Sequence, residues 1–344
     1  MVRRSAGGRV LSSLAIVAVL AGCSATASPT PAPATPPPAV AAATPTAAPS
    51  PSGSTAPTIG QPADDGARVI EVTTVDARIR DLTIDSPSVG TVKTRLLLPS
   101  GFEAQPSTHW PVLYLLVGGS GSYDDWTSYT DVEALTAPTN LLVVMAEADD
   151  GWYSDWWNGG QGGRPKWETF HLVELRQLIE GNWHAGDKRV VAGASMGGYG
   201  AMEYAARQPG MFLAAASYSG GLDPLGGGAW SNGFVQTADV WGNPVDQADI
   251  WSAQDPTDNA AALKGTALYV AYGNGQPGPL DASGSSADGI ESWAAIMNET
   301  FIAKLAVLKI PVTVDAYGPG THNWTYFQRD LHRSLPFLLK ALGE

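Results

Sequence analysis

The sequence has almost no cysteine and few basic residues, and each shortage excludes a class of protein or bond. The 344-residue chain contains one cysteine, Cys23, so no intramolecular disulfide can form. Lysine and arginine number 20 against 33 aspartates and glutamates, which gives a formal net charge of −13. A surface of that sign argues against polyanionic partners, and no cluster of basic residues offers a local exception. We therefore expect no nucleic acid partner.

Metal-ligand and phosphate-binding patterns are also lacking. The chain has only five histidines, and no two of them have the spacing that places metal ligands on one helix face. No GxxxxGK[ST] pattern is present, which makes a phosphate-binding loop a weak interpretation of the glycine-rich stretches. The sequence therefore predicts no metal site and no cofactor.

The N-terminus has the pattern of an export signal. Three basic residues, an apolar run and a small-residue site before a cysteine follow one another: Arg3, Arg4, Arg9, Val10–Leu20 and Ala21-Gly22-Cys23. This order is typical of a bacterial lipoprotein signal peptide, and the apolar run is too short to span a membrane comfortably. We expect cleavage after residue 22 and a lipid on Cys23. The alternative is an ordinary secretory signal with an incidental cysteine.

A stalk is predicted after the signal. From Ser24 to Pro62 the chain is almost wholly alanine, proline, threonine and serine, with eleven of its 26 prolines and no charged residue. Such a segment favours extended polyproline II at about 3.1 Å per residue and could reach about 120 Å. We expect a signal peptide at 1–22, a lipid-anchored stalk at 23–65 and one folded domain at 66–344. The protein would then sit on the outer face of the bacterial cell membrane.

The remaining residues alternate between strand and helix patterns. Short β-branched segments suggest an antiparallel opening, and compact apolar runs then suggest strands buried on both faces of a parallel sheet. The expected strands are Arg68–Thr74, Ala77–Ile84, Thr91–Leu98, Val112–Val117, Leu141–Ala146, Arg189–Ala192, Leu213–Ser217, Ala267–Tyr272 and Ile310–Ala316. The expected helices are Trp167–Trp183, Gly198–Arg207, Gly289–Val307 and Asn323–Leu342. This order predicts the α/β class and an α/β-hydrolase three-layer sandwich with a mostly parallel central sheet.

The stretch from Gly193 to Gly197 reads Gly-Ala-Ser-Met-Gly, between a predicted strand and a predicted helix. This pattern is typical of a nucleophile elbow, in which a strained turn exposes a serine hydroxyl. Ser195 is the candidate nucleophile, and the N–H of Met196 is a candidate oxyanion-hole donor. The alternative is a glycine-rich turn that caps a helix and has no chemistry.

The general base should lie on a loop after the last strand. His322 has that place, whereas His109, His171 and His184 precede the elbow and His332 falls within the last predicted helix. The alternative for His322 is a loop histidine that caps this helix.

The acid that orients the histidine should follow the strand that ends at Tyr272. Spacing leaves Asp281, Asp288 and Glu291 as candidates, and the main choice is between Asp281 and Glu291. Any of these carboxylates could instead be a solvated surface charge.

A second oxyanion donor should come from the loop after the strand that ends at Val117, where Gly119 is the candidate. Trp156, in an aromatic run that begins at Trp152, and Trp324 are candidates for lining the substrate site. Packing beneath the substrate loop is an equal alternative for the aromatic run.

A family resemblance rests on several motifs from about Thr91 onward. They are Tyr114-Leu115-Leu116, Trp152-Tyr153-Ser154-Asp155-Trp156, Lys166-Trp167-Glu168-Thr169-Phe170, the Gly-Ala-Ser-Met-Gly-Gly elbow, Asp255-Pro256-Thr257, Tyr272-Gly273-Asn274-Gly275 and Gly320-Thr321-His322-Asn323-Trp324. With them the domain resembles the antigen 85 mycolyltransferases and the wider esterase D-like family of α/β-hydrolases. The resemblance implies a serine, glutamate and histidine triad, and matching outward from Gly273 without a gap places the glutamate on Glu291.

The resemblance also has departures. The mycolyltransferases have an aspartate and an arginine around the oxyanion loop that serve the trehalose sugar, whereas this chain has Val117 and Ser120 there. Recognition of a sugar is therefore not expected from these two positions.

Together these features predict an exported serine esterase or acyltransferase that forms an acyl-enzyme on ester or lipid-like substrates. One alternative is a true mycolyl or diacylglycerol-type acyltransferase with a sugar or glycerol acceptor. Another is a silent hydrolase fold that binds cell-wall glycolipid or protein. The membrane would be a partner through the lipid anchor, and the sequence gives no indication of oligomeric state.

Overall fold

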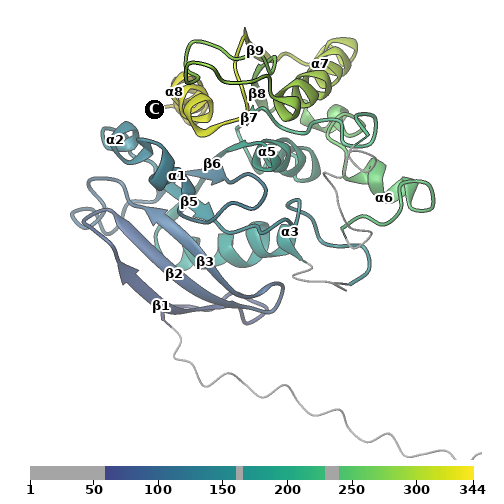
Figure 1. The fold of residues 1–344 in the computed structure, drawn as a ribbon. Helices are drawn as coiled ribbons and strands as arrows, with labels where there is room; N and C mark the ends of the chain where they lie inside the picture. The colour runs from purple at the N-terminus through teal and green to yellow at the C-terminus, as the bar shows by residue number, and fades with distance from the viewer. Residues whose placement is uncertain (1–58, 160–165, 229–239) are drawn as a thin grey trace, which may run out of the picture. The chain divides into compact units, whose positions relative to one another are not determined.

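The computed structural model describes residues 59–159, 166–228 and 240–344, and the structural statements below concern these residues (Figure 1). The predicted signal peptide, the predicted lipidation site Cys23 and most of the predicted stalk lie outside them. Within the described ranges, no helix combines the length and apolar character that a membrane span requires.

One mixed sheet of nine strands runs through the described part of the chain in the order β1-β2-β3-β5-β4-β6-β7-β8-β9. The strands are β1 (Arg68–Thr74), β2 (Ile79–Ser86), β3 (Gly90–Leu97), β4 (Trp110–Leu116), β5 (Leu142–Ala146), β6 (Ala185–Ala194), β7 (Ala214–Tyr218), β8 (Ala267–Gly273) and β9 (Thr313–Gly318). The pairings from β1 to β5 are antiparallel, and those from β5 through β9 are parallel. The carboxyl ends of the parallel strands therefore share one edge, which is where such sheets form ligand sites.

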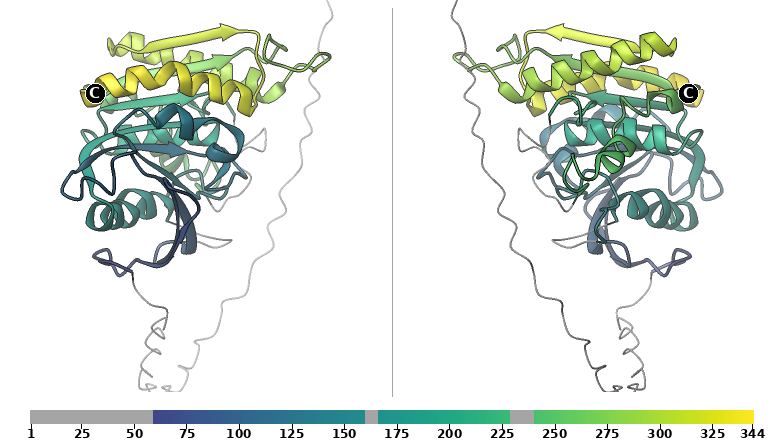
Figure 2. Two further views of the ribbon diagram at one scale, coloured as in Figure 1. Left: turned by 90° about the vertical axis from the view of Figure 1, so that its left-hand side faces the viewer. Right: turned by 90° about the vertical axis from the view of Figure 1, so that its right-hand side faces the viewer.

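Helices cover both faces of this sheet (Figures 1 and 2). One face packs against α1 (Asp125–Tyr129), α2 (Val132–Thr136) and α8 (Trp324–Leu342). The other packs against α4 (Arg176–Asn182), α5 (Met196–Arg207), α6 (Ala248–Ala253) and α7 (Gly289–Leu308). The molecule is thus a three-layer sandwich, as the sequence predicts.

Strand β4 shows why the sequence pattern identifies the central strands. Leu113 and Leu115 belong to the core beneath α8, whereas Val112, Tyr114 and Leu116 belong to the core beneath α5. Successive side chains of a strand point to opposite faces, so a strand covered on both sides must be apolar throughout. The continuous apolar run is the result.

The predicted strands and long helices are present with shifted ends. Strand β6 begins at Ala185 rather than Arg189, because Ala185 pairs with Trp110 at the start of β4. The predicted helix Trp167–Trp183 consists of three joined pieces: α3 (Trp167–Thr169), the π-helix η1 (Phe170–Leu175) and α4. The sequence pattern does not indicate the π-helical segment, because six residues are too few to show a period of their own. The short elements α1, α2, α6 and the 3-10 helix η2 (Ala260–Leu263) were not predicted, because they hold too few residues to show a period.

The folded unit begins before the predicted boundary at residue 66. The N–H of Gln61 donates to Asn182 Oδ1 over 2.6 Å, and Gln177 Nε2 donates to Asp64 Oδ2 over 2.8 Å. Ala63 is buried, and Ile59 forms a bridge with Val69 of β1. Composition assigns residues 59–65 to the end of the stalk, but these contacts, which composition cannot reveal, place them in the domain.

Candidate active site

Ser195 occupies a strained turn between β6 and α5. Its backbone has φ 56° and ψ −122°, outside the regions that non-glycine residues normally adopt. A Cβ atom at Gly193 would overlap the carbonyl of Gly197, and one at Gly197 would overlap the carbonyl of Leu116. The turn therefore requires glycine at both positions, which is the geometry of a nucleophile elbow.

Backbone donors border this serine. Met196 is the first residue of α5, and the first N–H groups of a helix have no acceptor within the helix. On the other side, a Cβ at Gly118 would lie 3.3 Å from Ser195 Cβ, so the Gly118–Gly119 peptide lies beside the serine. The structure thus places Met196 and Gly118 beside Ser195, and the oxyanion role of Met196 and of Gly119, the residue after Gly118, stays a prediction.

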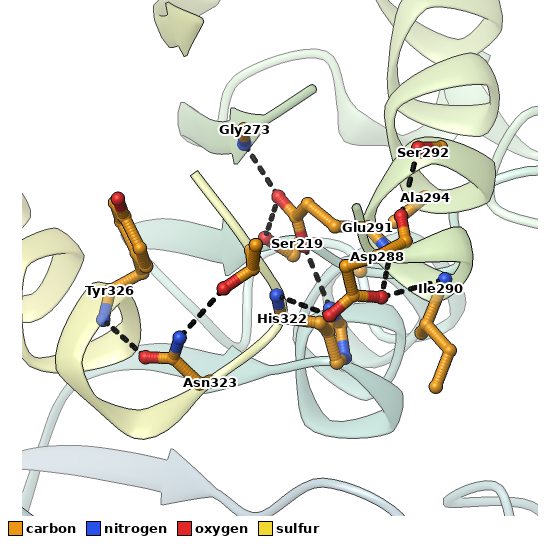
Figure 3. Close-up of polar contacts among 12 residues, drawn as sticks. Ser219, Gly273, Asp288, Ile290, Glu291, Ser292, Ala294, His322, Asn323 and Tyr326 are labelled. Atoms are coloured by element: carbon orange, nitrogen blue, oxygen red, sulfur yellow. Dashed lines mark hydrogen bonds and ion pairs between the residues drawn. The ribbon is translucent and has the colours of Figure 1, made fainter. Parts of the chain in front are cut away.

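Glu291 is held in the first turn of α7 with no exposed surface. Its Oε1 atom accepts from Ser219 Oγ over 2.8 Å and from the Gly273 N–H over 2.5 Å. Its Oε2 atom lies 2.7 Å from His322 Nδ1 (Figure 3). Both carboxylate oxygens therefore have partners, and one of those partners is the predicted base.

His322 differs from the four other histidines. The buried ring of His171 is hydrogen-bonded on both nitrogens, to Tyr204 OH and to the Glu147 carbonyl, and burial lowers its pKa to about 4. His332 pairs with Asp131 at the surface, and His109 and His184 contact each other edge to face. Among the histidines, only His322 pairs with a buried carboxylate through Nδ1 while its Nε2 has no hydrogen-bond partner among the described residues.

Ser195 and His322 do not share a hydrogen bond in this structure, but a short series of contacts connects them. The Ser195 N–H donates to the Tyr218 carbonyl over 2.8 Å, and the next residue, Ser219, donates to Glu291. Glu291 in turn pairs with His322. Catalytic hydrogen bonds are often long without substrate, so the geometry is compatible with a serine, histidine and glutamate site.

The other two acidic candidates hold the loop that carries His322, the predicted base. Asp288 caps α7 through the N–H groups of Ile290 and Glu291, at 2.8 and 3.1 Å. Its second oxygen accepts the His322 N–H over 2.9 Å (Figure 3). One carboxylate thus joins the helix of the acid to the backbone of the base. Sequence spacing alone gave no sign of this role.

Asp281 forms a second clamp. Its oxygens accept from Thr321 Oγ1 over 2.5 Å, Asn323 Nδ2 over 3.0 Å, Tyr326 OH over 3.1 Å and the Gly278 N–H over 2.7 Å. Burial acts to raise the pKa of Asp281, but these hydrogen bonds outweigh it and lower the pKa. With its acceptors engaged, this carboxylate supports the loop on both sides of His322 and does not contact the imidazole.

Backbone strain is concentrated at the same edge of the sheet. Non-glycine residues with positive φ follow each of the strands β4, β5, β6 and β7: Ser120, Asp149, Trp152, Tyr153, Ser195 and Ser219. Strained backbone of this kind tends to gather at functional sites. The positions of these strained residues indicate the same edge of the sheet as the side-chain contacts do, and they do so independently.

The oxyanion loop lacks the charges that the mycolyltransferases have there. Val117 is buried, and its carbonyl accepts from Tyr153 OH over 2.7 Å. Ser120 is exposed, and its N–H donates to Asp150 Oδ1 over 2.6 Å. Neither side chain offers a charged group to a sugar.

Trp156 and Trp324 are both half-buried. Trp156 Nε1 donates to the Gly151 carbonyl over 3.3 Å, and the Trp324 ring stacks on Tyr129 at a centroid distance of 5.3 Å. Neither lines the cavity of about 850 Å³ beside the His322 loop, so their contact with substrate stays a prediction. In the described ranges, no group of three or more His, Cys, Asp or Glu side chains could hold a metal ion.

Comparisons with known proteins show the family of this chain. Residues 89–338 match the family model Esterase, described as "Putative esterase". The chain is 30% identical over 289 residues to diacylglycerol acyltransferase/mycolyltransferase Ag85B of Mycolicibacterium smegmatis, covering 76% of this chain and 85% of that protein. It is 31% identical over 261 residues to esterase Rv1288 of Mycobacterium tuberculosis, covering 70% of this chain and 53% of that protein.

Solved structures share the fold. MPT51 of Mycobacterium tuberculosis superposes with a TM-score of 0.65 at 24% identity, covering 78% of this chain and 100% of that one. An S-formylglutathione hydrolase from Agrobacterium tumefaciens superposes with a TM-score of 0.64 at 16% identity, covering 80% of this chain and 99% of that one. At these identities the likeness shows the fold alone.

Proposed function

Since this chain belongs to the esterase family of α/β-hydrolase enzymes, which includes ester hydrolases and acyltransferases, we propose that it is an exported serine esterase or acyltransferase. Its substrates would be esters or lipid-like esters, and its catalytic residues would be Ser195, His322 and Glu291. The observation that carries the proposal is the 2.7 Å pair of His322 Nδ1 with the buried Glu291, while Nε2 has no hydrogen-bond partner in the part of the chain that the structure describes.

The proposed reaction has two steps. Ser195 Oγ attacks the ester carbonyl as His322 Nε2 takes its proton, and the tetrahedral oxyanion accepts hydrogen bonds from the N–H groups of Met196 and Gly119. The imidazolium then gives its proton to the departing alcohol, which leaves an acyl-enzyme. Water or an alcohol, deprotonated by the same nitrogen, next releases the acyl group and the serine. Glu291 holds the ring and stabilises its cation throughout.

The N-terminal signal supports a location outside the cell. Under this proposal residues 1–22 are removed, Cys23 carries lipid, and a stalk holds the catalytic domain at the outer face of the membrane. Metabolic labelling with a fatty acid tests it, because the wild type should become labelled and Cys23→Ser should not.

Nucleophile labelling tests the enzyme proposal. We expect a fluorophosphonate probe to modify Ser195 and a p-nitrophenyl ester to be hydrolysed, with both signals lost in Ser195→Ala. A folded wild-type protein that neither reacts nor hydrolyses would instead support a silent fold that binds glycolipid or protein.

Product analysis separates hydrolysis from transfer. With an activated ester and added glycerol or trehalose, an acyltransferase yields the acylated alcohol, whereas a hydrolase yields only the free acid. The similarity to Ag85B over 85% of that protein favours testing both acceptors. The uncharged Val117 and Ser120 lead us to expect poor use of trehalose.

A further inference from the structure

The outer face of α7 carries few charges: Glu299 is exposed and Lys304 is partly exposed. The exposed residues of this helix include a single ionisable one, Glu299: Gly289, Ile290, Ile296, Glu299, Thr300, Ala303, Ala306, Val307 and Leu308. On α8 the exposed residues include His332, Arg333 and Lys340, as expected for a helix that meets water. Helix α7 therefore presents to solvent a surface that helices usually bury.

Most of its exposed large apolar residues lie along one uncharged stripe. Ile290, Trp293, Ile296, Thr300, Ala303 and Val307 follow one another at intervals of three or four residues, which places them on one side of the helix. Ile290 is 44% exposed, Ile296 61% and Val307 78%. The helix holds 20 residues, so this α7 stripe is about 30 Å long. Figures 1 and 2 show α7 on the outside of the fold, near the β8 and β9 end of the sheet.

The α7 stripe leads to the candidate active site. Ile290 and Trp293 line the cavity of about 850 Å³, whose other wall includes Thr321 and Asn323, the neighbours of His322. Glu291 lies in the same first turn of the helix. A molecule lying along the stripe would therefore end beside the loop that carries the proposed base, with the buried Glu291 behind it.

The carboxylates of this cavity are already satisfied within the protein. The oxygens of Asp281 accept four hydrogen bonds from Gly278, Thr321, Asn323 and Tyr326. Those of Asp288 are also engaged, as described above. The lining of the cavity is mixed, with Ser285, Ser286 and Thr321 beside Ile290 and Trp293. The apolar area that a ligand could contact therefore lies mainly along the stripe.

We propose that the α7 stripe is the docking face for a neutral or zwitterionic lipid surface that presents an ester to the cavity. The proposal rests on the proposed function. An uncharged stripe can enter the boundary between headgroups and acyl chains without desolvating an ion. The net charge of −13 disfavours adsorption to anionic lipid, so apolar contact is the attraction that remains.

The predicted stalk makes such docking useful. A stalk that reaches about 120 Å keeps the domain near the membrane but does not orient it. Insertion of the stripe would turn the candidate active site toward the lipid. A second copy of this chain is the other occupant to consider, and the experiment includes it.

Vesicle flotation tests the proposal. The probe is a phosphatidylcholine vesicle, and the protein is the chain from residue 23 onward with Cys23→Ser, so that no lipid anchor contributes. The test variant is Ile296→Glu with Val307→Glu. The matched control is Val75→Glu with Val245→Glu, because these valines are 49% and 83% exposed and lie away from α7, just after β1 and just before α6.

We expect the wild type and the control to float with the vesicles equally at low and high salt, and the test variant to bind at least about tenfold less. Hydrolysis of a soluble short-chain ester should be equal in all three proteins. Hydrolysis of an ester embedded in the vesicles should fall only in the test variant.

Unchanged flotation of the test variant would overturn the proposal. So would a wild type that does not float but forms a dimer in sedimentation equilibrium that the test variant abolishes, because the occupant would then be a second copy. Failure of the proposed function has a different signature. In that case no protein hydrolyses the soluble ester, while the flotation comparison can still be read.

Discussion

At the scale of single residues, the choice of the acid depends on how α7 folds back onto the β8 and β9 loops. Asp281 and Glu291 are both close enough to β8 in sequence, so spacing could not decide between them. In the structure the Glu291 carboxylate contacts the imidazole, whereas Asp281 is enclosed by hydroxyl, amide and backbone donors. The family resemblance led to the same glutamate, and its catalytic role stays a proposal.

Glu291→Gln should lower kcat by about 10² to 10⁴-fold, because an amide cannot stabilise the imidazolium and favours the wrong tautomer. KM should change little, since Glu291 is buried behind the ring. Steady-state kinetics on a p-nitrophenyl ester measure both constants.

Asp281→Asn is the matched control, since it also replaces a carboxylate by an amide. It should keep a kcat close to that of the wild type and lower the melting temperature, because a clamp with fewer acceptors supports the loop less well. The reverse pattern of kcat values would show that the acid is assigned wrongly.

Asp288→Asn separates the two contacts of the capping residue. Asparagine is as good an N-cap as aspartate, so Oδ1 can still accept from Ile290 and Glu291. Its amide NH₂ cannot accept the His322 N–H. We expect kcat to fall about tenfold with KM nearly unchanged. Differential scanning calorimetry should show only a small loss of stability.

Asp288→Ala removes both contacts and should lower kcat and the melting temperature together. A wild-type kcat in Asp288→Asn would mean that the contact with the backbone of His322 does not position the base.

At the scale of elements, the structure confirms the predictions that depended only on residues close together in the sequence. The turn from β6 to α5 needs only neighbouring glycines, and the apolar run of β4 needs only burial on two faces, so both could be predicted. The π-helical turn η1 and the short helix α6 could not, because tertiary packing rather than periodicity sets them. The same holds for residues 59–65, which hydrogen-bond to side chains more than 100 positions away.

Gly193→Ala should destabilise the protein by about 2 kcal/mol or more, because the new methyl group overlaps the backbone of α5 and displaces it. Turnover and fluorophosphonate labelling of Ser195 should also be lost, since the elbow can no longer form. Chemical denaturation measures the free energy of unfolding.

Gly181→Ala provides the comparison, because its methyl group would meet nothing closer than 3.9 Å, at Gln61. Gly181 is the last residue but one of α4, where alanine should be neutral or stabilise the protein by up to about 1 kcal/mol. Equal stability of Gly193→Ala and the wild type would contradict the strained elbow.

At the scale of the whole molecule, acidic side chains are also buried outside the Ser195, His322 and Glu291 set, a feature that no sequence pattern reveals. Asp255 is 1% exposed and accepts from the N–H groups of Leu225 and Thr257, at 2.9 and 2.8 Å. Burial, with help from Asp223 and Asp258, raises its pKa to about 7 against these hydrogen bonds. In the unfolded chain its pKa returns to about 4.

These values give a pH dependence of stability with a definite sign. Between pH 5 and 7 the unfolded chain has released the Asp255 proton and the folded protein keeps it, so raising the pH favours unfolding by about 2 kcal/mol. Asparagine at this position cannot ionise, so Asp255→Asn does not lose this stability as the pH rises. We therefore expect the melting temperature of the variant, relative to the wild type, to rise between pH 5 and 8.

Comparing Asp255→Asn with the wild type cancels the contribution of other groups that titrate in this pH range. Burial lowers the pKa of His171 to about 4, which stabilises the fold as the pH rises through 6.5, in the wild type and the variant alike. A difference in melting temperature that stays constant from pH 5 to 8 would contradict the raised pKa of Asp255.

The order of the site residues along the chain has a consequence for biosynthesis. All residues of the predicted nucleophile turn have been synthesised by the end of α5, whereas the predicted base follows β9. The helix after that base, α8, covers the sheet at β6, β7 and β8. A ribosome therefore completes the nucleophile turn well before the histidine that would activate it. A nascent chain arrested before β9 would carry a complete serine turn and no base, and so remain inert until its final helix is delivered.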